Sequence, residues 1–245
     1  PMTEAPSPAG DRKVNLMIVA SGLGIGGAEI VIRDLALTLD PRLFNVSVCC
    51  LTWLGETADE LVRAGVDVTC LSTSSGTRVD YLTSIKLLRL IKAKRIDLVH
   101  THTTHGLVDA GICKLLRPRL KVIHTFHFGN YPHKESRALW MERTFSRVVD
   151  RLVAVGEVQR RQLQSVYRFR KDDLAVIHNG VKTAPDRSAD SFRARVGGEN
   201  RILVGTIATL IEQKGLRDLL AVARRFRDAG DHVRFVVVGE GYLRP

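Results

Sequence analysis

VNLMIVASGLGIGGAE, residues 14–29, is the stretch that decides the fold class. Its first seven residues form an apolar run rich in β-branched side chains, which predicts a buried strand. Residues 22–27 are rich in glycine, which lets the chain turn tightly. A helical apolar pattern begins near Ala28. A strand, a glycine-rich turn and a helix in this order indicate the first unit of a parallel α/β sheet.

The same alternation of apolar runs and amphipathic segments continues to residue 178. Further strands are predicted at 45–51, 66–71, 97–101, 121–125, 151–155 and 174–177, and helices at 28–39, 56–64, 80–94, 106–116, 135–149 and 157–167. Strands that are apolar throughout are typical of a parallel sheet covered on both faces. We therefore expect a Rossmann-like N-terminal domain at 14–178, preceded by a disordered segment at 1–13.

A second, smaller unit is expected after a polar segment. Residues 179–199, which open with the turn signal Asn179-Gly180, are interpreted as a linker. Beyond them, a strand at 201–207, a helix at 215–229 and a strand at 233–238 predict the first β-α-β of another Rossmann-like domain at 200–245. A unit of this length is too short to bury a core of its own. We therefore expect an incomplete C-terminal domain and a chain that is a fragment of a longer protein.

Composition excludes several protein classes. Of 245 residues, 44% are hydrophobic and 26% are charged, which is typical of a globular protein and not of a disordered or coiled-coil chain. No apolar run approaches the roughly 18 residues of a membrane-spanning helix, and the N-terminal residues lack the apolar core of a signal peptide. Cys49, Cys50, Cys70 and Cys113 lack the spacing of zinc ligands and are interpreted as buried thiols in a reducing cytoplasm.

The chain is strongly basic. Lys and Arg number 37 against 26 Asp and Glu, and the net charge of +11 favours anionic partners. Lys86, Arg89 and Lys92 lie on one polar helix face, for which solvation is the ordinary interpretation and attraction to anionic lipid headgroups the alternative. The expected location is the cytoplasm, with peripheral association at the inner face of the membrane as the alternative. No nucleic-acid-binding module is visible, so nucleic acid is not an expected partner.

The glycine-rich turn admits three interpretations. Gly22, Gly24 and Gly27 satisfy the spacing of the dinucleotide fingerprint, which would indicate an NAD(P)-binding oxidoreductase domain. That fingerprint also requires an acidic residue at the end of the second strand, and residues 48–52 contain none. The other interpretations are a phosphate-binding turn at a helix N-terminus and a tight turn that binds nothing.

Histidines gather where two neighbouring strands are predicted to end. His100 and His102 close one strand, and His124 and His127 follow the next. Carboxyl ends of parallel strands are where ligands bind in open α/β sheets. We interpret His100 and His124 as structural hydrogen-bonding groups, and His102 and His127 as polar groups that face a cleft. A zinc site is disfavoured because no cysteine or carboxylate lies at ligand spacing, and no Gly-x-Ser-x-Gly elbow of a serine hydrolase is present.

The second unit contributes a lysine and a further pair of glycines. Lys214 lies where the helix of this unit is predicted to begin, a position at which a cation is unfavourable against the helix dipole. An anion held between the lysine and the helix would explain it, and so would a solvated surface lysine. Gly239 and Gly241 follow the next strand and form a second turn at the carboxyl edge.

Taken in order, these motifs resemble those of a known enzyme family. The chain resembles the retaining GT-B glycosyltransferases of the family-4 type through residues 26–29, the histidines at both strand ends, Asn179-Gly180-Val181, residues 213–215 and residues 238–241. The resemblance implies two Rossmann-like domains and a hexosyltransferase that uses a nucleotide-sugar donor. It also implies a glycan or lipid-linked acceptor, and a role in polysaccharide or glycolipid biosynthesis. It implies no cofactor and no bound metal.

The resemblance also implies roles for individual residues. His127 and Lys214 would be catalytic, with Lys214 neutralising the leaving diphosphate. Gly26, Gly27, Lys214, Gly239 and Gly241 would bind the donor and its phosphates, and His102 and Glu29 would lie in the acceptor region or the cleft. Thr209 stands where the family usually has an arginine. Variable segments at 72–79 and 128–133 are expected to select the acceptor.

Two further hypotheses stay open. The first is the NAD(P)-binding domain described above. The second is a non-catalytic module that binds phospho-ligands or anionic membranes through its basic helices. Because the expected fragment lacks much of the donor site, we also expect it to be inactive by itself.

Overall fold

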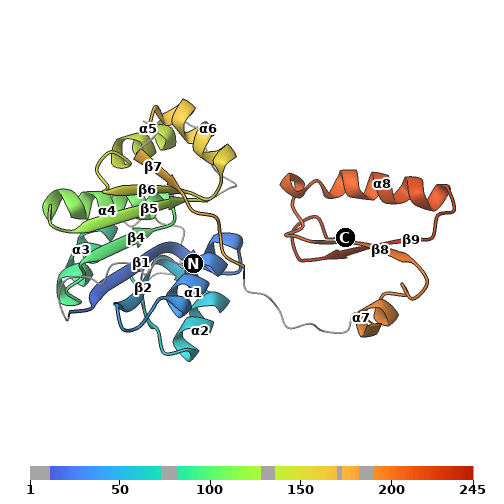
Figure 1. The fold of residues 1–245 in the computed structure, drawn as a ribbon, viewed down its shortest axis with the longest axis horizontal. Helices are drawn as coiled ribbons and strands as arrows, with labels where there is room; N and C mark the ends of the chain where they lie inside the picture. Colours follow the sequence, from blue (N-terminus) through green and yellow to red (C-terminus); the bar gives the residue numbers. More distant parts are fainter. Residues whose placement is uncertain (1–11, 73–81, 128–135, 170–172, 182–189, 245) are drawn as a thin grey trace, which may run out of the picture. The chain divides into compact units, whose positions relative to one another are not determined.

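The computed structural model describes residues 12–72, 82–127, 136–169, 173–181 and 190–244. The chain divides into two units, Pro1–Gly180 and Val181–Pro245, which are described separately (Figure 1). The division lies at the start of the segment interpreted as a linker. Among the described residues, no helix combines the length and apolar character needed to cross a membrane.

Unit 1 is built on a seven-stranded sheet. Its strands are β1 (Val14–Leu23), β2 (Phe44–Leu54), β3 (Asp67–Cys70), β4 (Leu98–Thr101), β5 (Lys121–Phe126), β6 (Arg151–Ala154) and β7 (Leu174–Val176). Its helices are α1 (Gly27–Thr38), α2 (Glu56–Arg63), α3 (Thr83–Ala93), α4 (Thr104–Leu116), α5 (Ser136–Phe145) and α6 (Glu157–Tyr167). Every strand pairing is parallel, and the order is β3-β2-β1-β4-β5-β6-β7. The predicted Rossmann-like α/β fold is confirmed.

The strand order reverses direction between β1 and β4. From β1 the chain builds outward through β2 to β3, and it then crosses back to pair β4 with β1 and continues through β5 to β7. In open sheets of this kind, ligands bind outside the carboxyl ends of the strands at the reversal. The residues after β1 and β4, namely Gly24–Gly27 and His102, therefore lie at the position where a site is expected.

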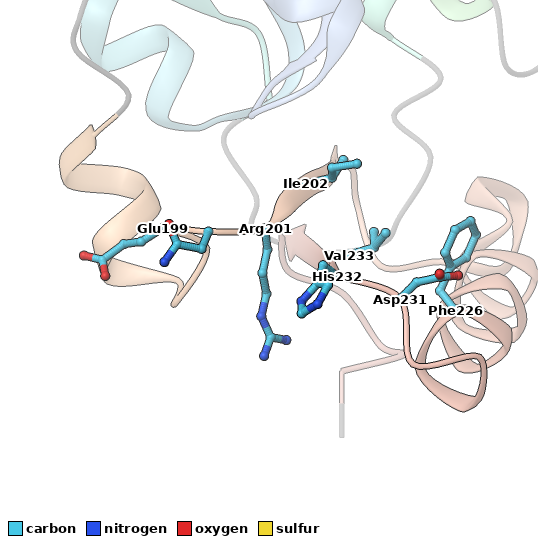
Figure 2. Close-up of a pocket in the computed structure, with 8 residues that line it drawn as sticks. Glu199, Arg201, Ile202, Phe226, Asp231, His232 and Val233 are labelled. Atoms are coloured by element: carbon cyan, nitrogen blue, oxygen red, sulfur yellow. The ribbon is translucent and has the colours of Figure 1, made fainter.

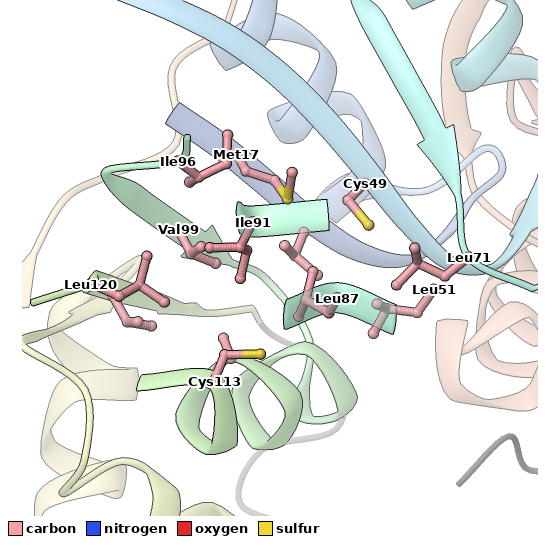
Figure 3. Close-up of a cluster of buried hydrophobic side chains, with 13 residues drawn as sticks. Met17, Cys49, Leu51, Leu71, Leu87, Ile91, Ile96, Val99, Cys113 and Leu120 are labelled. Carbon is pink, nitrogen blue, oxygen red and sulfur yellow. The ribbon is translucent and has the colours of Figure 1, made fainter. Parts of the chain in front are cut away.

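Both faces of this sheet are covered by apolar cores. Alternate residues of β1 point to opposite faces, so Met17 and Val19 join one core while Leu16 and Ile18 join the other. The first core packs under α3 and α4, with Leu87 and Ile91 fully buried (Figure 3). The second core packs under α1 and α2. Because the strands are buried on both faces, their sequences are continuous apolar runs.

A third core lies at the other end of the sheet, over β5, β6 and β7. Phe126, Tyr167 and Phe169 stack there, with ring centroids 5.5–6.4 Å apart. The buried Tyr167 hydroxyl donates to the carboxylate of Glu142, which is also fully buried and accepts from Thr104 at the start of α4. This carboxylate ties α5 to α6 and to the beginning of α4.

Unit 2 contains one β-α-β element, as predicted. After α7 (Asp190–Arg195) come β8 (Ile202–Ile207), the 3₁₀ helix η2 (Glu212–Lys214), α8 (Leu216–Asp228) and β9 (Val233–Val238). β8 and β9 pair in parallel along their whole length. Among the described apolar residues of this unit, only Leu210 and Leu216 are buried, and Ile207 is 86% exposed.

Several local predictions were wrong in extent, and others fall on residues outside the described ranges. β1 does not end at Ala20 but continues to Leu23 after a bulge between Ala20 and Gly22. Helix α5 ends at Phe145 and not at 149, because residues 146–148 turn back through hydrogen bonds to Glu142, Thr144 and Phe145. The segments 72–79 and 128–133, expected to select an acceptor, lie outside the described residues except for Ser72, as does most of the segment 1–13.

Candidate functional site

The glycine-rich stretch after β1 is shaped largely by one tryptophan. Trp53, near the end of β2, pairs with Gly22 in the sheet. A Cβ on Gly22, Gly24 or Gly55 would overlap the Trp53 indole, although Trp53 as a whole is 55% exposed. Two of the three glycines in the dinucleotide fingerprint are therefore required for packing within the protein, and the spacing by itself indicates no cofactor.

The start of α1 leaves one open approach to its backbone. Gly26 caps the helix in an extended conformation, and no side chain satisfies the free amides there. A Cβ at Gly26 would overlap the Glu29 carboxylate, whereas a Cβ at Gly27 would meet nothing within 4 Å. Glu29 lies in the first helical turn, where a negative charge is favourable. Of the two predicted donor-binding glycines, Gly27 has the unobstructed position, and Gly26 has the carboxylate of Glu29 over it.

Two histidines at the strand ends have the structural role that the sequence predicted. The His100 Nε2 atom lies 2.8 Å from Thr125 Oγ1, and the His124 Nδ1 atom lies 2.8 Å from Thr101 Oγ1. These contacts tie β4 to β5. Burial, with smaller contributions from neighbouring histidines, lowers the pKa of His100 to about 4 and that of His124 to about 3, so both rings are neutral at pH 7.

The other two histidines form a hydrogen-bonded pair. His102 Nδ1 lies 2.8 Å from His127 Nε2, and the rings stack with centroids 5.1 Å apart. Burial lowers the pKa of His127 to about 4 and holds the pKa of His102 well below its ordinary value. Both imidazoles are therefore neutral at pH 7, and one N–H lies between them. A neutral pair donates and accepts hydrogen bonds but contributes no net charge.

The cleft-facing interpretation of this pair needs correction. His102 is only 3% exposed and His127 only 9%. His102 was expected to line a cleft, yet it is more deeply buried than His127. Within the described part of the chain, its Nε2 atom has no hydrogen-bond partner. The physical reason is that the His102 amide bonds the Val19 carbonyl at 3.2 Å, which draws this residue into the sheet beside β1. Its hydrogen bond to His127 fixes the orientation of the two rings relative to each other.

A hydrogen bond joins the glycine-rich stretch to the histidine pair. Ser21 Oγ lies 2.8 Å from Thr103 Oγ1, and Thr103 caps α4 by accepting from the Gly106 amide at 3.2 Å. Thr103 follows His102 directly, so the end of β1, the start of α4 and the imidazole pair are fixed relative to one another. Neither Ser21 nor Trp53 was predicted from the sequence, because Ser21 and Thr103 are 82 residues apart and Trp53 reaches Gly22 from the neighbouring strand.

In unit 2, Lys214 does not begin the long helix. It ends the 3₁₀ helix η2, and Gly215, in the left-handed conformation with φ 66°, separates it from α8. Lys214 is exposed, and it directly precedes Gly215, the residue that caps α8. Its neighbour Arg217 is held by Glu212 at 2.8 Å. Thr209, which stands where a second cation was expected, is exposed and uncharged.

The paired glycines after β9 also have a structural explanation. A Cβ on Gly239 would overlap the Ala208 carbonyl oxygen, and one on Gly241 would overlap that of Leu210. The Leu210 amide donates to the Glu240 carbonyl at 2.8 Å. Glycine is thus needed for these two backbone segments to lie against each other. A donor-binding role for Gly239 and Gly241 stays a prediction.

Each unit also has a cavity of about 460 Å³ at the amino edge of its sheet. In unit 2 it lies where β8 and β9 begin, between Arg201, His232 and Phe226 (Figure 2). Figure 2 shows the Glu199 carboxylate directed away from the other labelled side chains. This cavity contains none of the predicted site residues, since Lys214, Gly239 and Gly241 lie at the opposite ends of the strands. Within the described ranges, no group of three or more His, Cys, Asp or Glu residues could hold a metal ion.

Comparison with known proteins agrees with this architecture. Residues 25–185 match the model of Glycosyltransferase Family 4. The chain is 26% identical over 176 residues to alpha-monoglucosyldiacylglycerol synthase of Streptococcus pneumoniae, an alignment that covers 64% of this chain and 39% of that protein. It is 26% identical over 217 residues to alpha-maltose-1-phosphate synthase of Mycolicibacterium smegmatis, covering 82% and 54%. The chain thus spans about half or less of the length of these curated relatives.

Among solved structures, the chain resembles HepE of Anabaena in complex with UDP and glucose. The TM-score is 0.75 at 20% sequence identity, covering 92% of this chain and 61% of that one. A glycosyltransferase from Rickettsia africae gives a TM-score of 0.71 at 17% identity, covering 93% and 60%. These likenesses confirm the predicted GT-B-like fold.

Proposed function

Since the chain belongs to glycosyltransferase family 4, we propose that the protein transfers a sugar from a nucleoside-diphosphate sugar to an acceptor hydroxyl. The structural observation that carries this proposal is the arrangement at the carboxyl edge of unit 1. There, the start of α1 at Gly27 and the His102–His127 pair are fixed together through Ser21 and Thr103. Free amides at a helix start attract an anion, and a neutral imidazole binds sugar hydroxyls without competing for the charge.

The proposed reaction requires the protein to stabilise negative charge on the leaving diphosphate. As the bond from the sugar to the diphosphate breaks, negative charge develops on the leaving group, and preorganised amides and a cation stabilise it. We assign the amide role to the start of α1 and the cation role to Lys214. The acceptor hydroxyl oxygen bonds to the anomeric carbon and passes its proton to an oxygen of the departing diphosphate. We propose retention at the anomeric carbon and no metal or other cofactor.

The names of the relatives suggest where to look for substrates. One curated relative is a synthase of a glucosylated diacylglycerol and the other a synthase of maltose-1-phosphate, and HepE was crystallised with UDP and glucose. We propose UDP-glucose as the first donor to test and a lipid-linked or soluble glycan acceptor. Surface polysaccharide or glycolipid synthesis in the cytoplasm, at or near the inner membrane face, is the setting that fits such substrates.

The alternative oxidoreductase function loses its support. It rested on the spacing of three glycines, and the structure explains Gly22 and Gly24 by their packing against Trp53. No observation in unit 1 favours a nicotinamide cofactor over a nucleotide sugar.

The test is release of nucleoside diphosphate by the full-length protein. UDP-glucose and GDP-mannose are supplied with diacylglycerol or oligosaccharide acceptors, and UDP or GDP is measured in the presence and absence of acceptor. His127→Ala and Lys214→Ala are expected to reduce turnover by 100-fold or more, as removal of one group that stabilises the transition state typically does. Unchanged turnover in both variants would refute the assigned roles.

A further inference from the structure

The second cavity, of about 460 Å³, lies in unit 1 at the amino edge of β6 and β7. Its lining comes from the turn after α5, the beginning of β6 and the residues just after α6. Arg151 begins β6, whereas His127 follows the end of β5, so the cavity is at the opposite edge of the sheet from the proposed transfer site. We refer to it as the arginine pocket because Arg147, Arg151 and Arg168 line it.

The three guanidinium groups of the arginine pocket are not neutralised by carboxylates. Arg147 Nη1 donates to the Arg143 carbonyl at 3.4 Å and Arg151 Nη1 to the Asp150 carbonyl at 2.9 Å. Within the described ranges, none of the three arginines forms an ion pair. All three are exposed and therefore have donors available to a ligand.

The acids beside the arginine pocket are already engaged. Asp150 accepts from Lys114 at 2.7 Å, from Lys121 at 3.3 Å and from the Val122 amide at 2.8 Å. Burial alone would raise the pKa of Asp150, but these donors hold it below its ordinary value, so the group stays ionised and paired. Asp173, the other acid of the lining, also has an interaction partner. The charge left for a ligand is positive.

A buried hydroxyl belongs to the lining of the arginine pocket. Ser146 lines the arginine pocket and is only 4% exposed, and its Oγ atom has no hydrogen-bond partner among the described residues. A buried polar group without a partner is costly and uncommon in folded proteins. An oxyanion in the pocket would accept the hydrogen bond from Ser146 and be held by the surrounding arginines.

The backbone at Arg168 has a conformation that is uncommon for residues other than glycine. Arg168 ends α6 in the left-handed conformation, with φ 58° and ψ 42°, a position at which glycine is the usual residue because it carries no Cβ. A side chain is strained there. Glycine at this position would relieve the strain, which makes Arg168→Gly a variant that removes the guanidinium without a cost to the backbone.

We propose that the arginine pocket binds a phosphate group, either inorganic phosphate or a phosphate monoester. The guanidinium groups of Arg147, Arg151 and Arg168 would hold its oxygens, and Ser146 Oγ would donate one hydrogen bond. The volume exceeds that of a phosphate ion and lies in the range of small-molecule sites, so it accommodates the organic part of a monoester. The phosphate has two possible sources, a soluble metabolite and a phospholipid headgroup.

The test uses variants that separate binding from folding. Thermal unfolding is followed by tryptophan emission with inorganic phosphate added, at constant ionic strength set with chloride, and phosphate affinity is measured by calorimetry. Arg168→Gly relieves the left-handed strain and is expected to melt no lower than the wild type, yet to weaken phosphate affinity by about tenfold or more. Ser146→Ala is expected to fold equally well and to lose part of the phosphate-induced shift.

Two control variants test whether the response to phosphate arises in the arginine pocket. Arg95→Gly makes the same change at the other left-handed arginine, with φ 51°, outside the lining of the arginine pocket, and it is expected to keep the full phosphate response. Lys214→Ala is also expected to keep it. A response that Arg168→Gly retains, or that Lys214→Ala abolishes, would overturn the proposal.

The source is distinguished by two further probes. Glycerol phosphate tests a soluble monoester, and sedimentation with phosphatidylcholine vesicles, with or without phosphatidic acid, tests a lipid headgroup. Stabilisation by glycerol phosphate that Arg168→Gly removes would support the soluble source. Binding to phosphatidic acid vesicles that Arg168→Gly removes would support the lipid source. Failure of inorganic phosphate, glycerol phosphate and vesicles alike would overturn the proposal.

Discussion

The buried histidines of unit 1 predict a steep loss of stability in mild acid. Burial lowers the pKa of His100 and His127 to about 4 and that of His124 to about 3, against about 6.5 in an unfolded chain. A base whose pKa is lower in the folded state binds protons preferentially when the chain unfolds. The stabilisation is therefore complete above about pH 6.5 and is lost as the pH falls toward 4.

The magnitude follows from these pKa values. At pH 5 each histidine is almost fully protonated in the unfolded chain and almost neutral in the folded one. Each therefore lowers the free energy of unfolding by about 2 kcal/mol relative to alkaline pH. The three together reduce the free energy of unfolding by about 5 kcal/mol between pH 7 and pH 5. Since small domains are stable by about 5–15 kcal/mol, this is a large fraction of the total.

Guanidinium unfolding followed by tryptophan emission measures this loss in unit 1 alone, because Trp53 and Trp140 both belong to it. His124→Asn retains an amide near Thr101 and removes one of four buried titrating rings, since the pKa of His102 is also lowered. The loss between pH 7 and pH 5 should therefore fall by about a quarter. His232→Gln, at an exposed position in unit 2, is the matched control and should leave the loss unchanged. Equal stability of the wild type at pH 7 and pH 5 would refute the reasoning.

Four other predictions concern packing, function and thiol reactivity. Gly24→Ala is expected to destabilise unit 1 by about 1–3 kcal/mol and to change the tryptophan emission, because its Cβ would overlap an indole. Gly27→Ala has open space and should melt no lower than the wild type while raising the KM for the sugar donor; a lowered midpoint or an unchanged KM would contradict this. Tyr167→Phe leaves the buried Glu142 carboxylate without one donor and should cost about 1–3 kcal/mol in the same unfolding assay. Burial raises the pKa of the Cys113 thiol to about 12, so mass spectrometry should detect iodoacetamide labelling only after unfolding.

The order of helices and strands was predictable because it depends on local periodicity. Helix α6 was predicted with its observed bounds, since Gly156 and Glu157 mark its start and its apolar residues repeat at the helical period. Helix α5 was predicted four residues too long, because Val148 and Val149 continue the apolar pattern. Those valines belong to the turn that precedes β6, and Val149 contributes to two of the apolar cores.

The site could be predicted only in part. The alternation of side chains along a strand correctly brought His100 close to His102, whose ring centroids lie 4.2 Å apart, and the strand ends placed His127 at the same edge. Sequence alone could not show that His102 is more deeply buried than His127, because its burial depends on the pairing of β4 with β1. It also could not assign Gly22 and Gly24 to packing, since Trp53 reaches them only through the register of β1 with β2.

The central claim is that a neutral His127, held by His102, meets the nucleotide sugar at the carboxyl edge of unit 1. Nitrogen-15 NMR of the imidazoles, recorded on the full-length protein during a titration with UDP-glucose and repeated across pH, tests it most directly. We predict that His127 stays neutral down to about pH 5 and that its resonances shift when the donor binds. A His127 that titrates near its unperturbed pKa of about 6.5, or that does not respond to saturating donor, would contradict the account.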